Sequence, residues 1–178
     1  MTHSHRKSTS ALGLLTNLAI FTALVPGTVT VWLPLFYLYP DIRHRALTGL
    51  GPAVAGVVVM AIGAAGYLWC ALDFAFFGKG TPAPIHMPKV LVMRGLYRFS
   101  RNPMYVSVLL ILAGEGVFFW STRLLEYTAM VFMAFHIFVL LQEEPALRKK
   151  MGIAYEQYRQ DVPRWIPRLK RVERTDAL

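Results

Sequence analysis

Charged residues are scarce in this chain. Only 16% of its 178 residues are charged and 55% are hydrophobic, a balance that soluble domains of this size rarely have. The hydrophobic residues gather into four runs, at residues 11–39, 50–77, 105–121 and 124–141. Each run is close to or above the roughly 17–25 residues that a helix needs to cross the hydrocarbon of a bilayer. The sequence therefore predicts membrane spans. A soluble bundle is disfavoured because residues 51–72 carry no charge on any helical face.

Cysteine and metal ligands are also lacking. The single cysteine, Cys70, excludes a disulfide within the chain. The five histidines do not have the spacing of metal ligands, so no metal site is expected. The first apolar run is too long for the core of a signal peptide, and no small-x-small cleavage site follows it before Pro40. We expect this run to be a retained span.

Positive charge is placed unevenly along the chain, whose formal net charge is +9. If four spans begin with the N-terminus inside, 16 of the 19 Lys and Arg residues lie on the cytoplasmic side. The positive-inside rule then predicts a multi-pass protein of the inner or plasma membrane with both termini in the cytoplasm. Basic residues beside spans attract anionic lipid headgroups. The charge therefore indicates a bilayer, and no nucleic acid, as the partner.

The chain is predicted to have three parts and an all-α fold. Residues 1–10 form a disordered lead, and residues 11–77 form two transmembrane helices whose internal proline and glycine predict a kink and close packing. Residues 78–178 hold a Gly/Pro-rich loop, a transmembrane hairpin and a cytoplasmic segment. We expect an integral membrane bundle of about four helices, followed by an amphipathic helix over residues 142–160.

The connection between the third and fourth spans is only three residues long, 121–123. It predicts a tight antiparallel hairpin. Both helices rise by the same distance per residue. In a hairpin that turns at Thr122, two residues at the same depth therefore have residue numbers whose sum is about 244. Glu143 is then level with Arg101. The two regions richest in polar residues are expected to meet at one face of the membrane.

The acids Glu143 and Glu144 directly follow the fourth span. Either they mark the point where the helix leaves the membrane, or their carboxylates bind a cationic amine or the hydroxyls of a ribose. Cytoplasmic helix ends usually carry Lys or Arg first. Here the two acids come first, and this order points toward binding.

Two further ionisable residues are candidates for catalysis. Glu115 lies inside the third span, where a charge costs roughly 2.5–3.5 kcal/mol. It is nearer the outer half than Glu143 and is either functional or hydrogen-bonded to a neighbouring helix. His136 lies up to two turns inward from Glu143 and is either a general base or a packing residue. Asp73, at the end of the second span, is expected at the surface.

Three segments resemble the superfamily of isoprenylcysteine carboxyl methyltransferases and phospholipid methyltransferases. They are GLYRFSRNPMY at 95–105, Gly114-Glu-Gly116, and EEPALRKKMGIAYEQYRQDVPRWIP at 143–167. The agreement covers about residues 78–168, in order and at the family's spacings. The resemblance implies a membrane-embedded methyltransferase that uses S-adenosylmethionine without a Rossmann domain. Its acceptor is expected to be lipophilic, either an isoprenoid or lipid carboxylate or a lipid amine.

The resemblance also implies which residues contact the cofactor: Lys89, Val90, Leu91, Val92, Tyr97, Arg101, Asn102, Pro103, Met104, Tyr105, Gly114, Gly116, Glu143 and Glu144. Two positions depart from the family pattern. Asn102 stands where the family usually has His, so a titrating group is lost there. Val139 stands where the eukaryotic prenylcysteine enzymes have Arg, which disfavours a prenyl-cysteine substrate.

Two other functions stay open at this stage. A membrane sterol or enone reductase that uses NADPH has a similar C-terminal half, although it would need further spans and a basic cluster for the 2′-phosphate. A non-catalytic membrane scaffold would bind no cofactor. The sequence does not predict the oligomeric state.

Overall fold

The computed structural model describes residues 11–36, 49–77, 91 and 93–167. This part of the chain is helical and contains no strand, which confirms the all-α prediction. Its elements are α1 (Ala11–Leu24), the π turn η1 (Thr28–Trp32), α3 (Leu50–Phe77), the 3-10 turn η2 (Gly95–Arg98), α4 (Pro103–Phe118), α5 (Thr122–Phe138), the π turn η3 (Val139–Glu143), α6 (Glu144–Met151) and α7 (Ile153–Asp161). The lead expected at residues 1–10 lies outside the described residues.

Three helical segments are long and apolar enough to cross a membrane, at Leu18–Phe36, Leu50–Phe74 and Thr122–Met151. Large apolar side chains remain exposed on all three, as lipid contact requires, for example Trp32, Ile62 and Met130. Helix α4 is also apolar but has only 16 residues, or about 24 Å at 1.5 Å per residue. A fourth span at α4 therefore stays a prediction.

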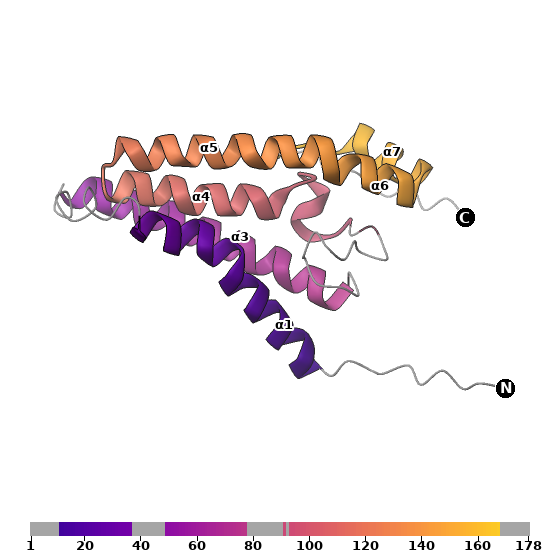
Figure 1. Cartoon of the computed structure of the whole chain (residues 1–178), viewed down its shortest axis with the longest axis horizontal. Coiled ribbons are helices and arrows are strands. Elements are labelled where there is room, and N and C mark those ends of the chain that lie inside the picture. Colours follow the sequence, from indigo (N-terminus) through magenta and orange to yellow (C-terminus); the bar gives the residue numbers. More distant parts are fainter. Residues whose placement is uncertain (1–10, 37–48, 78–90, 92, 168–178) are drawn as a thin grey trace.

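Helices α3, α4 and α5 lie along the long axis of the molecule, with α4 between the other two (Figure 1). Pro103 begins α4, as its fixed φ and missing N–H favour. Helices α4 and α5 are antiparallel neighbours joined by residues 119–121, which confirms the predicted hairpin. The end of α3, the start of α4 and the helices α6 and α7 share one end of the bundle (Figure 1, right).

Helix α3 approaches α4 closely through glycine. A Cβ on Gly63 would stand 2.7 Å from the carbonyl oxygen of Ser107, and a Cβ on Gly56 would stand 2.7 Å from that of Gly114. Such separations are below ordinary van der Waals contact, so a larger residue would push the helices apart. The small residues of the second span predict close packing, and this contact confirms it.

Both π turns stand shortly before a proline. Pro34 follows η1 and Pro145 follows η3, at the same offset. In a π pattern the donor to the carbonyl of Val29 would be Pro34, which has no N–H. The hydroxyl of Tyr127 on α5 donates to that carbonyl at 3.0 Å. The first span bends here, as its proline and glycine predict (Figure 1), and Tyr127 ties the bend to α5.

The charged stretch after η3 is divided in two, contrary to the single helix expected over residues 142–160. Gly152 has φ +57° and ψ −132°, a conformation open to glycine and strained for other residues. Helix α6 ends and α7 begins there. Tyr155 and Tyr158 of α7 are buried with Val162 in a small apolar cluster. The Tyr158 hydroxyl also donates to a carbonyl of η2 at 2.7 Å, so α7 is fixed beside the start of α4.

Candidate active site

The polar residues of α4 and η3 meet at this end of the bundle. The Tyr105 hydroxyl donates to Oε2 of Glu143 at 3.1 Å. Next to it, Nη1 of Arg101 lies 3.0 Å from Oε1 of Glu144. Equal depth in the hairpin predicted that these two regions meet, and the contacts confirm it within one helical turn.

Aromatic side chains form pairs around Tyr105 and Tyr97. Tyr105 packs on Phe135 with ring centroids 4.6 Å apart, and Tyr97 packs near Phe74 at 6.5 Å. Burial first, and then the neighbouring ionisable groups Cys70 and Glu143, raise the pKa of Tyr97 well above its ordinary value. Tyr97 therefore keeps its proton at physiological pH and can act as a hydrogen-bond donor but not as a base.

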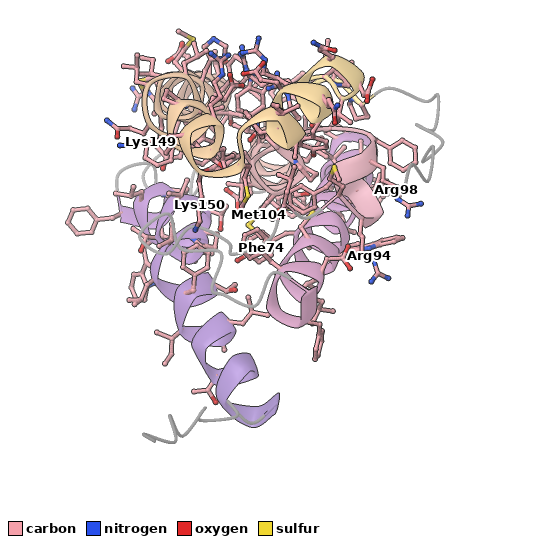
Figure 2. All side chains as sticks on the ribbon, turned by 90° about the vertical axis from the view of Figure 1, so that its right-hand side faces the viewer. Phe74, Arg94, Arg98, Met104, Lys149 and Lys150 are labelled. Atoms are coloured by element: carbon pink, nitrogen blue, oxygen red, sulfur yellow. The ribbon has the colours of Figure 1, made fainter. Side chains whose placement is uncertain are left out.

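Basic side chains flank the same end. Figure 2 views this end and shows Phe74 and Met104 near its middle, Lys149 and Lys150 of α6 on one flank, and Arg94 and Arg98 of the η2 region on the other. A basic rim of this kind suits the boundary between a membrane and water, where anionic headgroups lie.

Glu144 accepts hydrogen bonds from two arginines. Its Oε1 accepts from Nη1 of Arg101 at 3.0 Å and from Nε of Arg164 at 2.6 Å, and its Oε2 accepts from Nη2 of Arg164 at 3.1 Å. The side chains of Glu144 and Arg101 are only 6% and 9% exposed, so both charges are shielded from water. The bond with Glu144 raises the pKa of Arg164, which keeps its positive charge. We call these three side chains the clasp.

The backbone after α7 is held by the turn before α4. The N–H of Arg101 donates to the carbonyl of Pro163 at 2.9 Å. The carbonyl of Arg164 accepts from Oγ of Ser100 at 3.1 Å and from Nδ2 of Asn102 at 3.2 Å. Asn102, which replaces the usual family His, thus serves as an amide donor, a role that needs no titration. Residues 162–165 therefore cover the start of α4.

His136 belongs to an aromatic cluster. Its Nδ1 accepts a hydrogen bond from Nε1 of Trp165 at 3.0 Å, and its ring lies 5.8 Å from Phe132 and 5.9 Å from Trp165. A neutral imidazole has one basic nitrogen, and this bond occupies it. The geometry favours the packing role that the sequence left open, because a general base would first have to give up Trp165.

Glu115, Gly114 and Gly116 lie far from the acidic pair. Ten residues of α4 separate Tyr105 from Glu115, or roughly 15 Å along the helix axis. Gly114 packs closely against α3, and Gly116 packs closely against α5. The structure does not bring this motif together with Glu143, so any effect of the motif on a cofactor would be transmitted through helix packing.

Asp73 is half-buried, so the surface position that the sequence predicts holds for only part of its side chain. Its Oδ2 is buried against Gly95 and has no hydrogen-bond partner among the described residues. Gly95 has φ +52°, and any side chain there would collide with this oxygen. A cavity of about 300 Å³ opens at the same place, lined by Trp69, Gly95, Leu96, Arg98 and Phe99. One oxygen of Asp73 is therefore covered because the chain folds back over it at η2.

Of the four cofactor contacts expected at residues 89–92, the structure describes one. Lys89, Val90 and Val92 lie outside the described residues. Leu91 packs against the tyrosine cluster of α7. In the described part of the chain, no group of three or more His, Cys, Asp or Glu side chains could hold a metal ion.

Arg164 and Trp165 contact predicted site residues but are not themselves predicted. Their partners are Glu144 and His136, 20 and 29 residues earlier in the chain. The hairpin arithmetic does not reach beyond Gly152, where the helix ends. The only signal in the sequence is the place of these two residues inside the C-terminal motif that resembles the family.

A comparison with family models supports the resemblance over the helical part of the chain, up to residue 153. The model of the family described as phospholipid methyltransferase matches residues 52–153, more than half of the chain. No curated protein and no solved structure shows a significant similarity to this chain. The matched residues include α3, α4, α5 and the acidic pair. The chain belongs to the phospholipid methyltransferase family and is a membrane methyltransferase.

Proposed function

We propose that the protein transfers a methyl group from S-adenosylmethionine to a lipophilic acceptor, at the end of the bundle where Glu143 meets Tyr105. The observation that carries this proposal is that Glu143 has no basic partner among the described residues. Its carboxylate is half-buried. It accepts a hydrogen bond from a neutral phenol and forms no ion pair with a described Lys or Arg. A carboxylate in such surroundings is stabilised by a cation or by hydroxyl groups.

A second observation supports the cofactor. Nε of Arg101 is buried and has no hydrogen-bond partner among the described residues. Buried polar groups without partners are rare, and an ordered water, an ion or a ligand can satisfy them. S-adenosylmethionine carries a carboxylate that suits Arg101, and ribose hydroxyls and positive groups that suit Glu143. The donor set therefore fits this cofactor, with Tyr97, Met104 and the residues before η2 as further contacts.

When bound, the cofactor supplies an electrophilic methyl group on a sulfonium. The chain itself would orient that group and exclude water from it. Aromatic rings attract a sulfonium through cation–π contact. Tyr105 stands next to Glu143 and packs on Phe135. An acceptor carboxylate is already ionised and needs no base. An amine has to lose a proton, and His136 would have to release Trp165 to take it.

The acceptor is proposed to be a lipid or another lipophilic molecule that enters from the bilayer. The cavity beside η2 supports this, because its walls are mainly apolar and Arg98 is the one charged side chain among its described lining residues. It lies next to Trp69, which is 56% exposed on the outer face of α3. Entry of the acceptor from the membrane and of the cofactor from the cytoplasm agrees with the charge distribution.

Calorimetry on the detergent-purified full chain tests the cofactor. Wild-type protein is titrated with S-adenosylmethionine, S-adenosylhomocysteine and NADPH, and Glu143→Gln is titrated alongside. We expect both adenosyl compounds to bind and the variant to bind S-adenosylhomocysteine at least about tenfold more weakly, a loss of roughly 1.4 kcal/mol. Glu156→Gln, an acid that is 43% exposed, is the control and should bind as the wild type does. Binding of NADPH alone would favour a reductase, and no binding of any of the three compounds would favour a scaffold.

A further inference from the structure

The two neighbouring acids have different partners. Glu143 faces a neutral hydroxyl, whereas Glu144 accepts three hydrogen bonds from two arginines. We propose that the clasp of Arg101, Glu144 and Arg164 is a positioning device that fixes Glu143 and Tyr105 in the geometry that binds the cofactor. This inference rests on the proposed function and gives Arg164 and Trp165 a role in positioning the residues that bind the cofactor.

The hydrogen bonds of Glu144 leave it little capacity for a ligand. A carboxylate offers about four acceptor positions, and three are occupied by N–H groups at 2.6–3.1 Å. Arg164 binds both oxygens in the two-point geometry that holds a carboxylate in one orientation. Glu144 is therefore a structural partner of the two arginines, and Glu143 is the acid that remains for a cofactor.

The clasp joins three segments that each carry part of the site. Arg101 lies in the turn that leads into α4, four residues before Tyr105. Glu144 directly follows Glu143 in the same helical segment. Arg164 lies in the segment that returns over both. A shift of any of the three therefore changes the separation of Tyr105 and Glu143.

Trp165 extends the same connection to the interior. Its Nε1 donates to Nδ1 of His136, and its ring lies 6.5 Å from Tyr105 and 5.2 Å from Phe132. The segment 163–165 thus contacts the site from two sides. His136 holds Trp165 in place, which gives this intramembrane histidine a purpose that needs no proton transfer.

A purely structural tie and a positioning device predict different results. A structural tie contributes to stability and is indifferent to the cofactor. A positioning device is coupled to the cofactor, and such coupling is reciprocal. Bound S-adenosylhomocysteine should then slow hydrogen exchange at the Arg101 amide, which donates to Pro163, and loss of the clasp should weaken both the affinity and this protection.

The experiment compares three variants of the full chain in detergent. Arg164→Gln removes the charge and the two-point contact. Arg164→Lys keeps the charge and loses the second hydrogen bond. Glu156→Gln is the control, since Glu156 pairs with Arg148 and Arg159 at an exposed site in the same region. Calorimetry with S-adenosylhomocysteine gives the affinity, hydrogen exchange over residues 99–104 and 162–166 gives the coupling, and thermal unfolding verifies the fold.

We expect Arg164→Gln to lower the affinity about five- to thirtyfold, within the usual range of coupling between sites, and to abolish the protection caused by the ligand. Arg164→Lys should recover part of both, and Glu156→Gln should equal the wild type. If Arg164→Gln folds, frees the segment 162–166 and still binds with wild-type affinity, the clasp is only a structural tie. If Arg164→Gln does not fold, equal affinity of Arg164→Lys and wild type would lead to the same conclusion. A wild-type protein that binds no S-adenosylhomocysteine overturns the proposed function itself, before any variant is compared.

Discussion

The hydroxyl of Tyr105 donates to the carboxylate of Glu143 at 3.1 Å, across the α4–α5 hairpin and 38 residues along the chain. This contact joins the arginine–aromatic turn to the acidic pair, the two parts of the sequence that resemble methyltransferases. The hydrogen bond orients one carboxylate oxygen, and the other accepts no hydrogen bond from a described residue, so we propose that it meets the ligand. The pairing therefore gives the most direct test of the site.

Tyr105→Phe should weaken binding of S-adenosylhomocysteine about three- to tenfold. The change removes one hydrogen bond to a charged group, worth roughly 1.5 kcal/mol, and keeps the ring that packs on Phe135. Calorimetry measures the affinity, and a near-native thermal midpoint shows that the fold is kept. An affinity equal to that of the wild type would remove Tyr105 from the site.

Tyr127→Phe should destabilise the protein without an effect on ligand affinity. Pro34 has no N–H to donate, so the substitution leaves the carbonyl of Val29 without its hydrogen-bond donor. Hydrogen bonds between membrane helices contribute about 0.6–1.7 kcal/mol, and a loss of this size is expected in an unfolding titration with SDS. Tyr127 is remote from the acidic pair, so calorimetry should give wild-type affinity. Unchanged stability would mean that the bend of the first span needs no tie to α5.

Gly63→Ala should cost more stability than Gly51→Ala. A Cβ at Gly63 would stand 2.7 Å from a backbone oxygen of α4, whereas a Cβ at Gly51 meets nothing within 4 Å. Overpacking of this kind costs about 1–3 kcal/mol, and alanine at an open helical site is neutral or favourable. The same SDS titration compares the two variants. Equal stability of both would show that α3 and α4 have room to separate.

Stability should fall at alkaline pH through the buried tyrosines of the C-terminal segment. Burial raises the pKa of Tyr158 above its ordinary value, while the unfolded chain ionises near pH 10. The titration of Tyr158 therefore leaves the free energy of unfolding unchanged below about pH 10. It lowers this free energy as the pH rises further, because the unfolded state releases the proton first.

Tyr158→Phe is the variant that isolates this effect. It should be less stable at pH 7, where its hydrogen bond to the Tyr97 carbonyl at 2.7 Å is lost. It should also show a smaller decline between pH 9 and 11 than the wild type in chemical unfolding. A decline of equal size in both proteins would assign the alkaline loss to other groups.

The sequence by itself determined the elements that depend on local patterns. Long uncharged runs set the apolar helices, because the hydrocarbon of a bilayer demands them. A three-residue connection set the hairpin and hence the level at which Glu143 meets the turn before α4. The small residues of α3 set its close approach to α4. Each of these follows from length, composition or helical rise, without knowledge of distant contacts.

Only the tertiary structure decided which polar side chains face each other. Glu143 and Glu144 look equivalent in the sequence, yet successive residues of a helix point in different directions, so one meets Tyr105 and the other meets Arg101 and Arg164. Gly152 turns the chain back and brings Arg164 over the site, a contact that no periodic pattern encodes. One oxygen of Asp73 becomes buried because η2 returns over it. Hydropathy and helical rise fix depth in the membrane, while the direction of a side chain depends on the neighbours that the whole fold supplies.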